Sequence, residues 1–221
     1  MQFSGFQKLT LLDFPGHVAC TLFTAGCNFR CPFCHNAALV THIDNSHYFS
    51  EEEVLTYLKK RASIMDGVCI TGGEPLMHKD LPQFIAKGKA LGYKVKIDTN
   101  GSYPERLAEL IDSGNIDYVA MDIKNSKEKY FETAVCSEQD FDNVLKSVEL
   151  LKQGKVDFEF RTTVVREYHT VEDIKQISEW IAPVNKYFLQ NFTDSGDLIK
   201  NNLSAHSRET IEFMRSAAED T

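Results

Sequence analysis

The 221-residue sequence has no apolar run long enough to cross a membrane and no excess of basic residues. A transmembrane helix needs about 20 consecutive apolar residues. Lysine and arginine total 24 against 32 aspartate and glutamate residues, which gives a formal net charge of −8. Nonspecific nucleic-acid binding and adsorption to anionic lipid both depend on basic surfaces. We therefore expect neither nucleic acid nor a membrane as a partner.

Nothing in the first residues of the sequence resembles a secretory signal. Residues 1–10 contain one lysine and no apolar segment of the kind that signal peptides carry. We therefore expect a cytoplasmic protein, in which thiols stay reduced. In that setting, clustered cysteines indicate metal ligands or catalytic groups rather than disulfides.

Cysteine is sparse except in one segment. Three of the six cysteines, Cys27, Cys31 and Cys34, form a C-x3-C-x2-C motif. Gly26 and Pro32 disfavour a helix or strand here, so the segment predicts a loop that can turn three thiolates toward one centre. Thiolates are soft ligands that suit an Fe–S cluster or zinc.

The segment has no fourth cysteine, so three thiolates would leave one metal position open. Structural zinc sites and ferredoxin-like clusters fill all four positions with protein ligands, whereas catalytic sites keep one open. The alternative is zinc bound by the three thiolates and His35. That arrangement requires the adjacent Cys34 and His35 to bend back onto one tetrahedral ion. We predict none of His35, His42 and His47 as a metal ligand.

The cysteine motif, with Phe33 before its last cysteine, is similar to the signature of the radical S-adenosylmethionine (SAM) enzymes. The resemblance implies that Cys27, Cys31 and Cys34 ligate three irons of one [4Fe–4S] cluster and that SAM chelates the fourth. It implies reductive cleavage of SAM to methionine and a 5′-deoxyadenosyl radical. It also implies that Phe33 lies near the adenine.

Asp13-Phe14-Pro15-Gly16 and Cys34-His35-Asn36 resemble the subgroup that activates glycyl radical enzymes. The nearest resemblance is to the anaerobic ribonucleoside-triphosphate reductase activating proteins, although many activases have D-G-P-G where this chain has Phe14. This implies a glycyl radical enzyme as protein substrate and flavodoxin or another one-electron donor as reductant.

Two other functions stay open. One is a radical SAM enzyme with a small-molecule substrate, such as a 7-carboxy-7-deazaguanine synthase-like enzyme. The other is a non-catalytic Fe–S or zinc protein. Residues 37–66 contain no cysteine, and Cys20, Cys69 and Cys136 are dispersed, so we predict one cluster and no second site.

Strand and helix patterns alternate six times along the chain. Runs rich in β-branched and aromatic residues predict strands at 17–24, 67–71, 93–99, 118–123, 156–165 and 186–192. Ser50, Ser102, Ser137 and Thr170 are expected to cap helices between or before them. Such alternation predicts an α/β fold with a parallel sheet.

The chain is short for a closed eight-unit barrel, which usually needs about 250 residues. We therefore predict an incomplete (β/α)6 TIM-like barrel, which is also the fold that the radical SAM resemblance implies. We expect one domain over residues 1–221, with a core at about 17–192 and a C-terminal extension at 193–221.

Polar residues stand at or near the carboxyl ends of successive predicted strands, where parallel α/β folds place their chemistry. Taken singly, each has an ordinary explanation as a turn, cap or surface residue. Together they favour a charged cosubstrate. The set is Gly72, Gly73, Glu74, Asp98, Thr99, Asp122, Lys124 and Arg161.

The resemblance suggests roles for these residues around SAM. Gly72 and Gly73 let the backbone approach the SAM ammonium, and Glu74 either accepts a hydrogen bond from it or braces the turn. Lys124 and Arg161 are expected at the carboxylate or ribose.

The resemblance also implies a monovalent cation beside SAM. The residues at the corresponding positions are Asp98, Thr99 and Asp122.

Overall fold

The computed structural model describes residues 1–43 and 47–219. Its main sheet has the strand order β2-β3-β5-β6-β7-β8-β9. All strands from β3 to β9 in this sheet are parallel, and β2 is antiparallel to β3. The strands are β2 (Gly5–Thr10), β3 (Ala19–Thr24), β5 (Gly67–Gly72), β6 (Lys94–Thr99), β7 (Tyr118–Asp122), β8 (Asp157–Val164) and β9 (Tyr187–Asn191).

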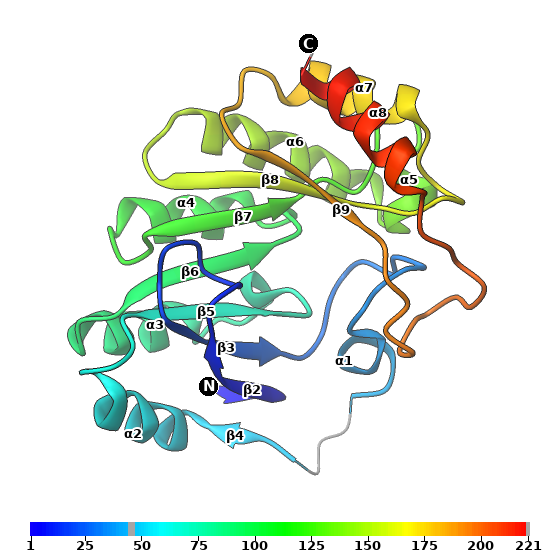
Figure 1. Ribbon diagram of the computed structural model, residues 1–221. Coiled ribbons are helices and arrows are strands. Elements are labelled where there is room, and N and C mark those ends of the chain that lie inside the picture. Colours follow the sequence, from blue (N-terminus) through cyan, green and yellow to red (C-terminus); the bar gives the residue numbers. More distant parts are fainter. Residues whose placement is uncertain (44–46, 220–221) are drawn as a thin grey trace.

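The predicted α/β fold with a parallel sheet is confirmed, and each of the six predicted strands is present. In Figure 1 the parallel strands point the same way, with the cysteine loop beyond their carboxyl ends. The sheet begins at β2 and ends at β9, and these two edges do not pair with each other among the described residues. The barrel is therefore open along one side.

Helices connect the parallel strands. Ser50, Ser137 and Thr170 each cap a helix through a reciprocal bond with the residue three positions on, as predicted. The helices are α1 (Ala37–Thr41), α2 (Glu51–Arg61), α3 (Leu81–Ala90), α4 (Pro104–Asp112), α5 (Tyr130–Ala134), α6 (Glu138–Lys152), α7 (Val171–Ile181) and α8 (Arg208–Glu219), with a 3-10 turn at Pro75–Met77.

The predicted cap at Ser102 is wrong. The N-cap of helix α4 is the next residue, Tyr103, and Pro104 occupies the first helical position. Pro104 needs no backbone donor there and so starts the helix itself. The Ser102 hydroxyl instead donates to Asn100 Oδ1 at 2.6 Å and accepts from Asn28 Nδ2 at 2.9 Å. Ser102 thereby links Asn28 of the cysteine loop to Asn100 at the end of β6.

The sequence patterns missed several short elements. Strand β2 was not predicted, nor were β1 (Gln2–Phe3) and β4 (Phe49–Ser50), which pair with each other. The short helices α1 and α5 were not predicted either. Each is too short to show a clear period in its apolar residues, which is the signal on which such predictions depend.

Phe14 seals the end of the barrel that is opposite the cysteine loop. Its side chain is 2% exposed and packs against His17 and Tyr118, with ring centroids 4.3 and 6.1 Å away. The neighbouring Asp13 accepts a 2.5 Å hydrogen bond from Thr21 of β3. The Asp13–Gly16 segment thus has a structural role as a plug between the first two strands of the main sheet.

The C-terminal extension covers part of the cysteine loop. Residues 193–207 carry no helix or strand, and α8 then packs beside α7. The Lys200 amide donates to the Pro32 carbonyl at 2.9 Å, and Asp197 accepts from the Ala38 amide at 3.0 Å. Among the described residues, no helix combines the length and apolar character that a bilayer span requires.

We predict that Phe14→Ala lowers the free energy of unfolding by about 3–5 kcal/mol, because it leaves a cavity between buried aromatic rings. Urea unfolding followed by circular dichroism measures this change. The matched control is Leu12→Ala, at a side chain that is 89% exposed, which should cost no more than about 0.5 kcal/mol. Equal costs for the two variants would contradict the assigned plug.

Candidate active site

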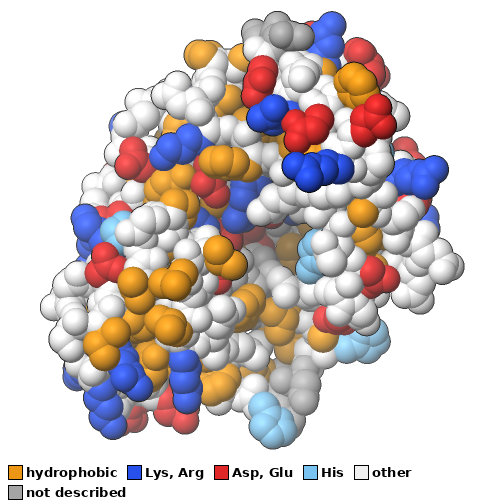
Figure 2. All heavy atoms as spheres, viewed as in Figure 1, with side chains coloured by type: hydrophobic (Ala, Val, Ile, Leu, Met, Phe, Trp, Pro, Cys, Tyr) orange, Lys and Arg blue, Asp and Glu red, His pale blue; other side chains and the backbone are white. Residues whose placement is uncertain are grey.

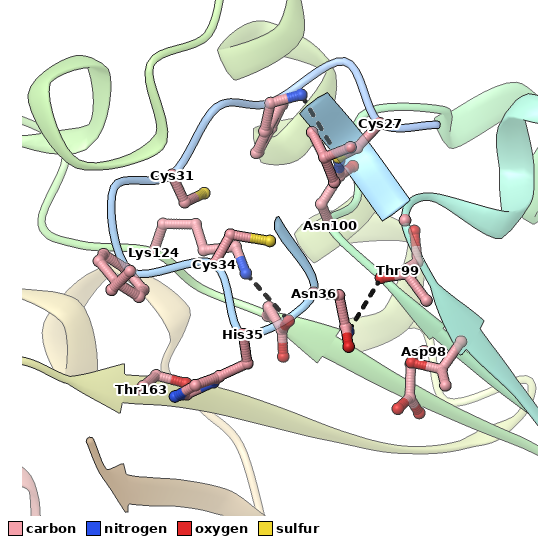
Figure 3. A pocket seen from close by; sticks show the side chains of 17 residues that line it. Cys27, Cys31, Cys34, His35, Asn36, Asp98, Thr99, Asn100, Lys124 and Thr163 are labelled. Carbon is pink, nitrogen blue, oxygen red and sulfur yellow. Dashed lines mark hydrogen bonds and ion pairs between the residues drawn. The ribbon is translucent and has the colours of Figure 1, made fainter. Parts of the chain in front are cut away.

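A pocket lies at the carboxyl ends of the parallel strands. It holds about 760 Å³ of empty space, counting the part open to solvent. Figure 3 shows the three cysteines placed around it together with Lys124. Its lining is formed by Cys27, Phe29, Cys31, Phe33, Cys34, His35, Asn36, Val40, Thr71, Gly72, Gly73, Asp98, Thr99, Asn100, Asp122, Lys124 and Thr163.

The cysteine loop leaves β3 and is held on two sides by backbone contacts. The Cys34 amide donates to the Cys31 carbonyl at 3.0 Å, which folds the loop back on itself. The Ala134 carbonyl accepts from the Arg30 amide at 3.1 Å and from the Cys31 thiol at 3.7 Å. Contacts with the last residue of α5 thus hold the Arg30–Cys31 part of the loop.

Burial makes these cysteines poor thiolates on their own. It raises the pKa of Cys27 to about 11 and that of Cys31 to about 12, and it also raises the pKa of Cys34. All three are therefore neutral thiols at neutral pH in the metal-free protein. Metal binding requires thiolates, so loading the site must displace these protons.

The donor set fits a cluster better than a single zinc ion. His35, the fourth ligand of the zinc alternative, donates from Nε2 to the Thr193 carbonyl at 2.8 Å and stacks on Phe192. Over residues 1–43 and 47–219, no three His, Cys, Asp or Glu side chains are gathered closely enough to hold one metal ion. A [4Fe–4S] cluster binds each thiolate through a different iron and so spaces its ligands further apart.

The turn after β5 lies directly against the start of the cysteine loop. The Gly73 amide donates to the Thr24 carbonyl at 2.8 Å, and the Glu74 amide to the Gly26 carbonyl at 2.7 Å. A Cβ atom at position 73 would lie 1.9 Å from the Gly26 oxygen, and one at position 72 would lie 2.5 Å from the Thr24 backbone. Both positions therefore require glycine.

Glu74 braces this turn from inside the protein. Its side chain is fully buried and accepts hydrogen bonds from the Leu76 amide at 3.0 Å, Thr99 Oγ1 at 2.8 Å and the Asn100 amide at 2.6 Å. Burial raises the pKa of Glu74 to about 7 despite these donors. Of the two roles considered for Glu74, the geometry supports bracing, because Glu74 does not line the pocket.

The floor of the pocket is an ionic network across β6, β7 and β8. Arg161 pairs with Asp98 at 3.3 Å and with Asp122 at 3.0 Å. Lys96 pairs with the other oxygen of Asp98, and Lys124 with the other oxygen of Asp122 at 3.0 Å. Arg161 therefore lies behind the carboxylates and does not line the pocket.

These pairs set the charge of the groups that do face the pocket. Burial alone would raise the pKa of Asp122, but Lys124 and Arg161 hold it down at about 2. Burial alone would lower the pKa of Lys124, but the ionised Asp122 raises it. The Lys124 backbone is fixed by His169, whose Nε2 donates to the Lys124 carbonyl at 2.8 Å. Lys124 thus presents a permanent, positioned cation near the thiols.

The structure brings together most of the residues expected at the site. The three cysteines, Phe33, Gly72, Gly73, Asp98, Thr99, Asp122 and Lys124 all line the pocket, whereas Glu74 and Arg161 support it from behind. Phe33 is 4% exposed and packs beside Tyr168 and His169.

Sequence reasoning did not select Asn36, Asn100 and Thr163, which also line the pocket. Asn100 donates from Nδ2 to Cys27 Sγ at 3.6 Å and to Asn28 Oδ1 at 3.0 Å. Asn100 could have been selected from the sequence, because it directly follows Asp98 and Thr99 at the end of a predicted strand.

The remaining cysteines have no grouped arrangement. Cys20 and Cys69 are buried in β3 and β5, as expected of packed thiols, and Cys136 is half-buried. The Cys69 thiol lies 3.9 Å from Asp98 and from the Lys96 ammonium. All six cysteines are free of disulfides.

Residues 21–181 match the family model of the radical SAM superfamily. This chain belongs to that superfamily. Membership implies a [4Fe–4S] cluster and SAM. The match spans the cysteine loop, the turn after β5 and the ionic floor, which are the parts that build the pocket.

Curated relatives differ in their named activities. A candidate glycyl-radical enzyme activating enzyme of Methanocaldococcus jannaschii is 36% identical over 193 residues, which cover 86% of this chain and 79% of the relative. The 7-carboxy-7-deazaguanine synthase of the same organism is 25% identical over 210 residues, covering 88% of this chain and 82% of the relative. The GTP 3′,8-cyclase of Helicobacter pylori is 29% identical over 162 residues, and the match spans 49% of its length.

Solved structures share the fold at low sequence identity. The Streptococcus suis protein SuiB, solved with SAM bound, has a TM-score of 0.71 at 15% identity over 89% of this chain and 45% of its own. TYW1, solved with a lysine-pyruvate adduct, has a TM-score of 0.67 at 15% identity over 92% of this chain and 73% of its own. The open (β/α)6 barrel is thus the arrangement found in radical SAM proteins.

We predict that Gly73→Ala displaces the cysteine loop, because the new methyl group would overlap the Gly26 carbonyl. The loss of stability should reach about 2 kcal/mol or more, since backbone must move. Chemical unfolding measures stability, and bound iron after anaerobic reconstitution measures the loop.

The matched control is Gly88→Ala in α3, where an added methyl group meets nothing within 4 Å. Alanine favours a helix over glycine by about 0.5–1 kcal/mol, so this variant should be no less stable than the wild type and should bind iron normally. A Gly73→Ala protein with wild-type stability and iron content would refute the close packing.

Proposed function

We propose that the pocket binds SAM against a [4Fe–4S] cluster held by Cys27, Cys31 and Cys34. The supporting observation is that three thiols on one loop line the same pocket as Gly72, Gly73 and the cation of Lys124. When bound, the cluster supplies the electron and the open iron for reductive cleavage of SAM. The chain's own residues bind and orient SAM.

Each wall of the pocket suits one part of SAM. The peptide groups of Gly72 and Gly73 lie open to the pocket and suit the SAM ammonium, since no side chain blocks the approach. Lys124, held in place by Asp122, suits the carboxylate through a charge-assisted hydrogen bond. Phe33 provides an apolar wall for the adenine.

We further propose that the protein activates a glycyl radical enzyme, with anaerobic ribonucleoside-triphosphate reductase as the first candidate. The Methanocaldococcus jannaschii relative at 36% identity supports this activity, as do the Asp13–Gly16 and Cys34–Asn36 segments. Flavodoxin or another one-electron donor would reduce the cluster.

The open barrel suits a protein substrate. The edges β2 and β9 leave one side of the barrel unclosed within the described chain, and Figure 2 shows a hollow where recessed charged side chains lie between hydrophobic ones. A loop of the partner could enter this side and reach the pocket. Its binding would also exclude water from a reactive site.

The second candidate function is radical chemistry on a small molecule. It is supported by the 7-carboxy-7-deazaguanine synthase relative, whose match covers nearly the same share of this chain as the activase match. This function predicts substrate turnover without any protein partner.

We predict that Cys31→Ala abolishes cluster assembly and SAM cleavage while the fold is retained. Two thiols then remain in the loop, and the other three cysteines are dispersed, so none of them can replace the lost ligand. Iron content, visible absorption and 5′-deoxyadenosine production under dithionite measure the loss. Cys136→Ala, at a half-buried cysteine outside the motif, is the control and should keep all three. A brown, SAM-cleaving Cys31→Ala protein would exclude this ligand.

The activase proposal predicts a glycyl radical on the partner. Reduced, cluster-loaded protein incubated with SAM and anaerobic ribonucleotide reductase should give a doublet in the EPR spectrum of the reductase. A reductase variant with alanine at the target glycine should give none. SAM cleavage with no doublet on any glycyl radical partner, together with turnover of a small molecule, would favour the second function.

A further inference from the structure

The two carboxylates expected to hold a monovalent cation are already neutralised by the protein. Asp98 Oδ1 pairs with Lys96, and Asp98 Oδ2 with Arg161 at 3.3 Å. Asp122 Oδ1 pairs with Arg161 at 3.0 Å, and Asp122 Oδ2 with Lys124 at 3.0 Å. All four carboxylate oxygens therefore have a cationic partner within the chain.

The third expected cation ligand is also engaged. The Thr99 hydroxyl donates to Glu74 Oε1 at 2.8 Å and accepts from the Gly101 amide at 3.1 Å. These two bonds use the hydroxyl proton and one of the two oxygen lone pairs, so the Thr99 oxygen offers a cation a single lone pair. Most of the bonding capacity of the oxygens at this edge of the pocket is thus taken up by contacts within the protein.

Arg161 is placed to act as a permanent cation. It stands opposite Asp122 in the register of β7 and β8, its side chain is 15% exposed, and its guanidinium bridges both carboxylates. A guanidinium does not lose its proton in proteins. Lys96, at 2% side-chain exposure, lies behind Asp98 as a second buried cation.

The balance of charge disfavours an added alkali ion. Lys96, Arg161 and Lys124 surround Asp98 and Asp122, so an ion placed between the carboxylates would lie beside three like charges. The further carboxylate on β8, Glu159, accepts from the Tyr118 hydroxyl at 2.7 Å. An alkali ion at this position would be repelled by all three built-in cations.

We infer that Arg161, backed by Lys96, is a built-in counter-cation that replaces a dissociable monovalent cation beside SAM. Arg161 is a positioning residue: it fixes Asp98 and Asp122, which face the pocket, and does not line the pocket itself. The inference rests on the proposed SAM site. SAM binding by this protein then needs no alkali metal ion.

The first test uses the wild-type protein in sodium, potassium or choline chloride at equal ionic strength. The dissociation constant of SAM, measured calorimetrically on cluster-loaded protein, should agree within about twofold among the salts. The melting temperature of the cluster-free protein should also be the same in each salt, because an ion that binds the folded state would raise it.

The second test removes the built-in cation. Arg161→Gln should weaken SAM binding by at least about tenfold in choline chloride, with partial recovery in sodium or potassium chloride, because an alkali ion can then enter between the carboxylates. Arg166→Gln, at an exposed arginine just after β8, is the matched control and should match the wild type in every salt.

The outcomes separate this inference from the SAM site itself. Wild-type SAM affinity that falls at least about tenfold in choline chloride would overturn the built-in cation and leave the SAM site standing. So would an Arg161→Gln protein with unchanged SAM affinity in choline chloride. A wild-type protein that binds no SAM in any salt would overturn the site and this inference together. If Arg161→Gln does not fold, the wild-type comparison decides alone.

Discussion

The site depends on one contact between two backbones, in which the turn after β5 lies directly against the start of the cysteine loop. Gly73 and Gly26 approach so closely that any side chain at position 73 would overlap a carbonyl oxygen. Glu74 then carries this contact to the end of β6 through Thr99 and Asn100. The ends of β3, β5 and β6 are thereby fixed together, and the sheet thus determines where the thiols lie.

The floor of the pocket is held in place by ion pairs. Arg161 joins the carboxylates at the ends of β6 and β7, and Lys124 completes the row under the thiols. Because these groups are largely buried and mutually paired, little rearrangement is needed when a charged cosubstrate arrives. A site arranged in advance spends less of its binding energy on ordering itself.

The sequence predicted the parallel sheet, its six parallel strands and the cysteine loop, because each depends on local patterns that are strong in this chain. It also selected the polar residues at the strand ends. It could not separate those that face the pocket from those behind it: Glu74 and Arg161 are decided by tertiary contacts with Asn100 and Asp98. The strand β2 and the plug at Phe14 depend on contacts across the sheet, which no local pattern reveals.

The central claim is that three thiolates leave one iron of a cubane open and that SAM fills it. Mössbauer spectroscopy of protein reconstituted with ⁵⁷Fe, with and without SAM, tests this most directly. The account predicts a [4Fe–4S] spectrum in which one iron site of the four changes when SAM is added. Four irons that do not respond to SAM, or a protein that holds zinc in place of iron, would contradict it.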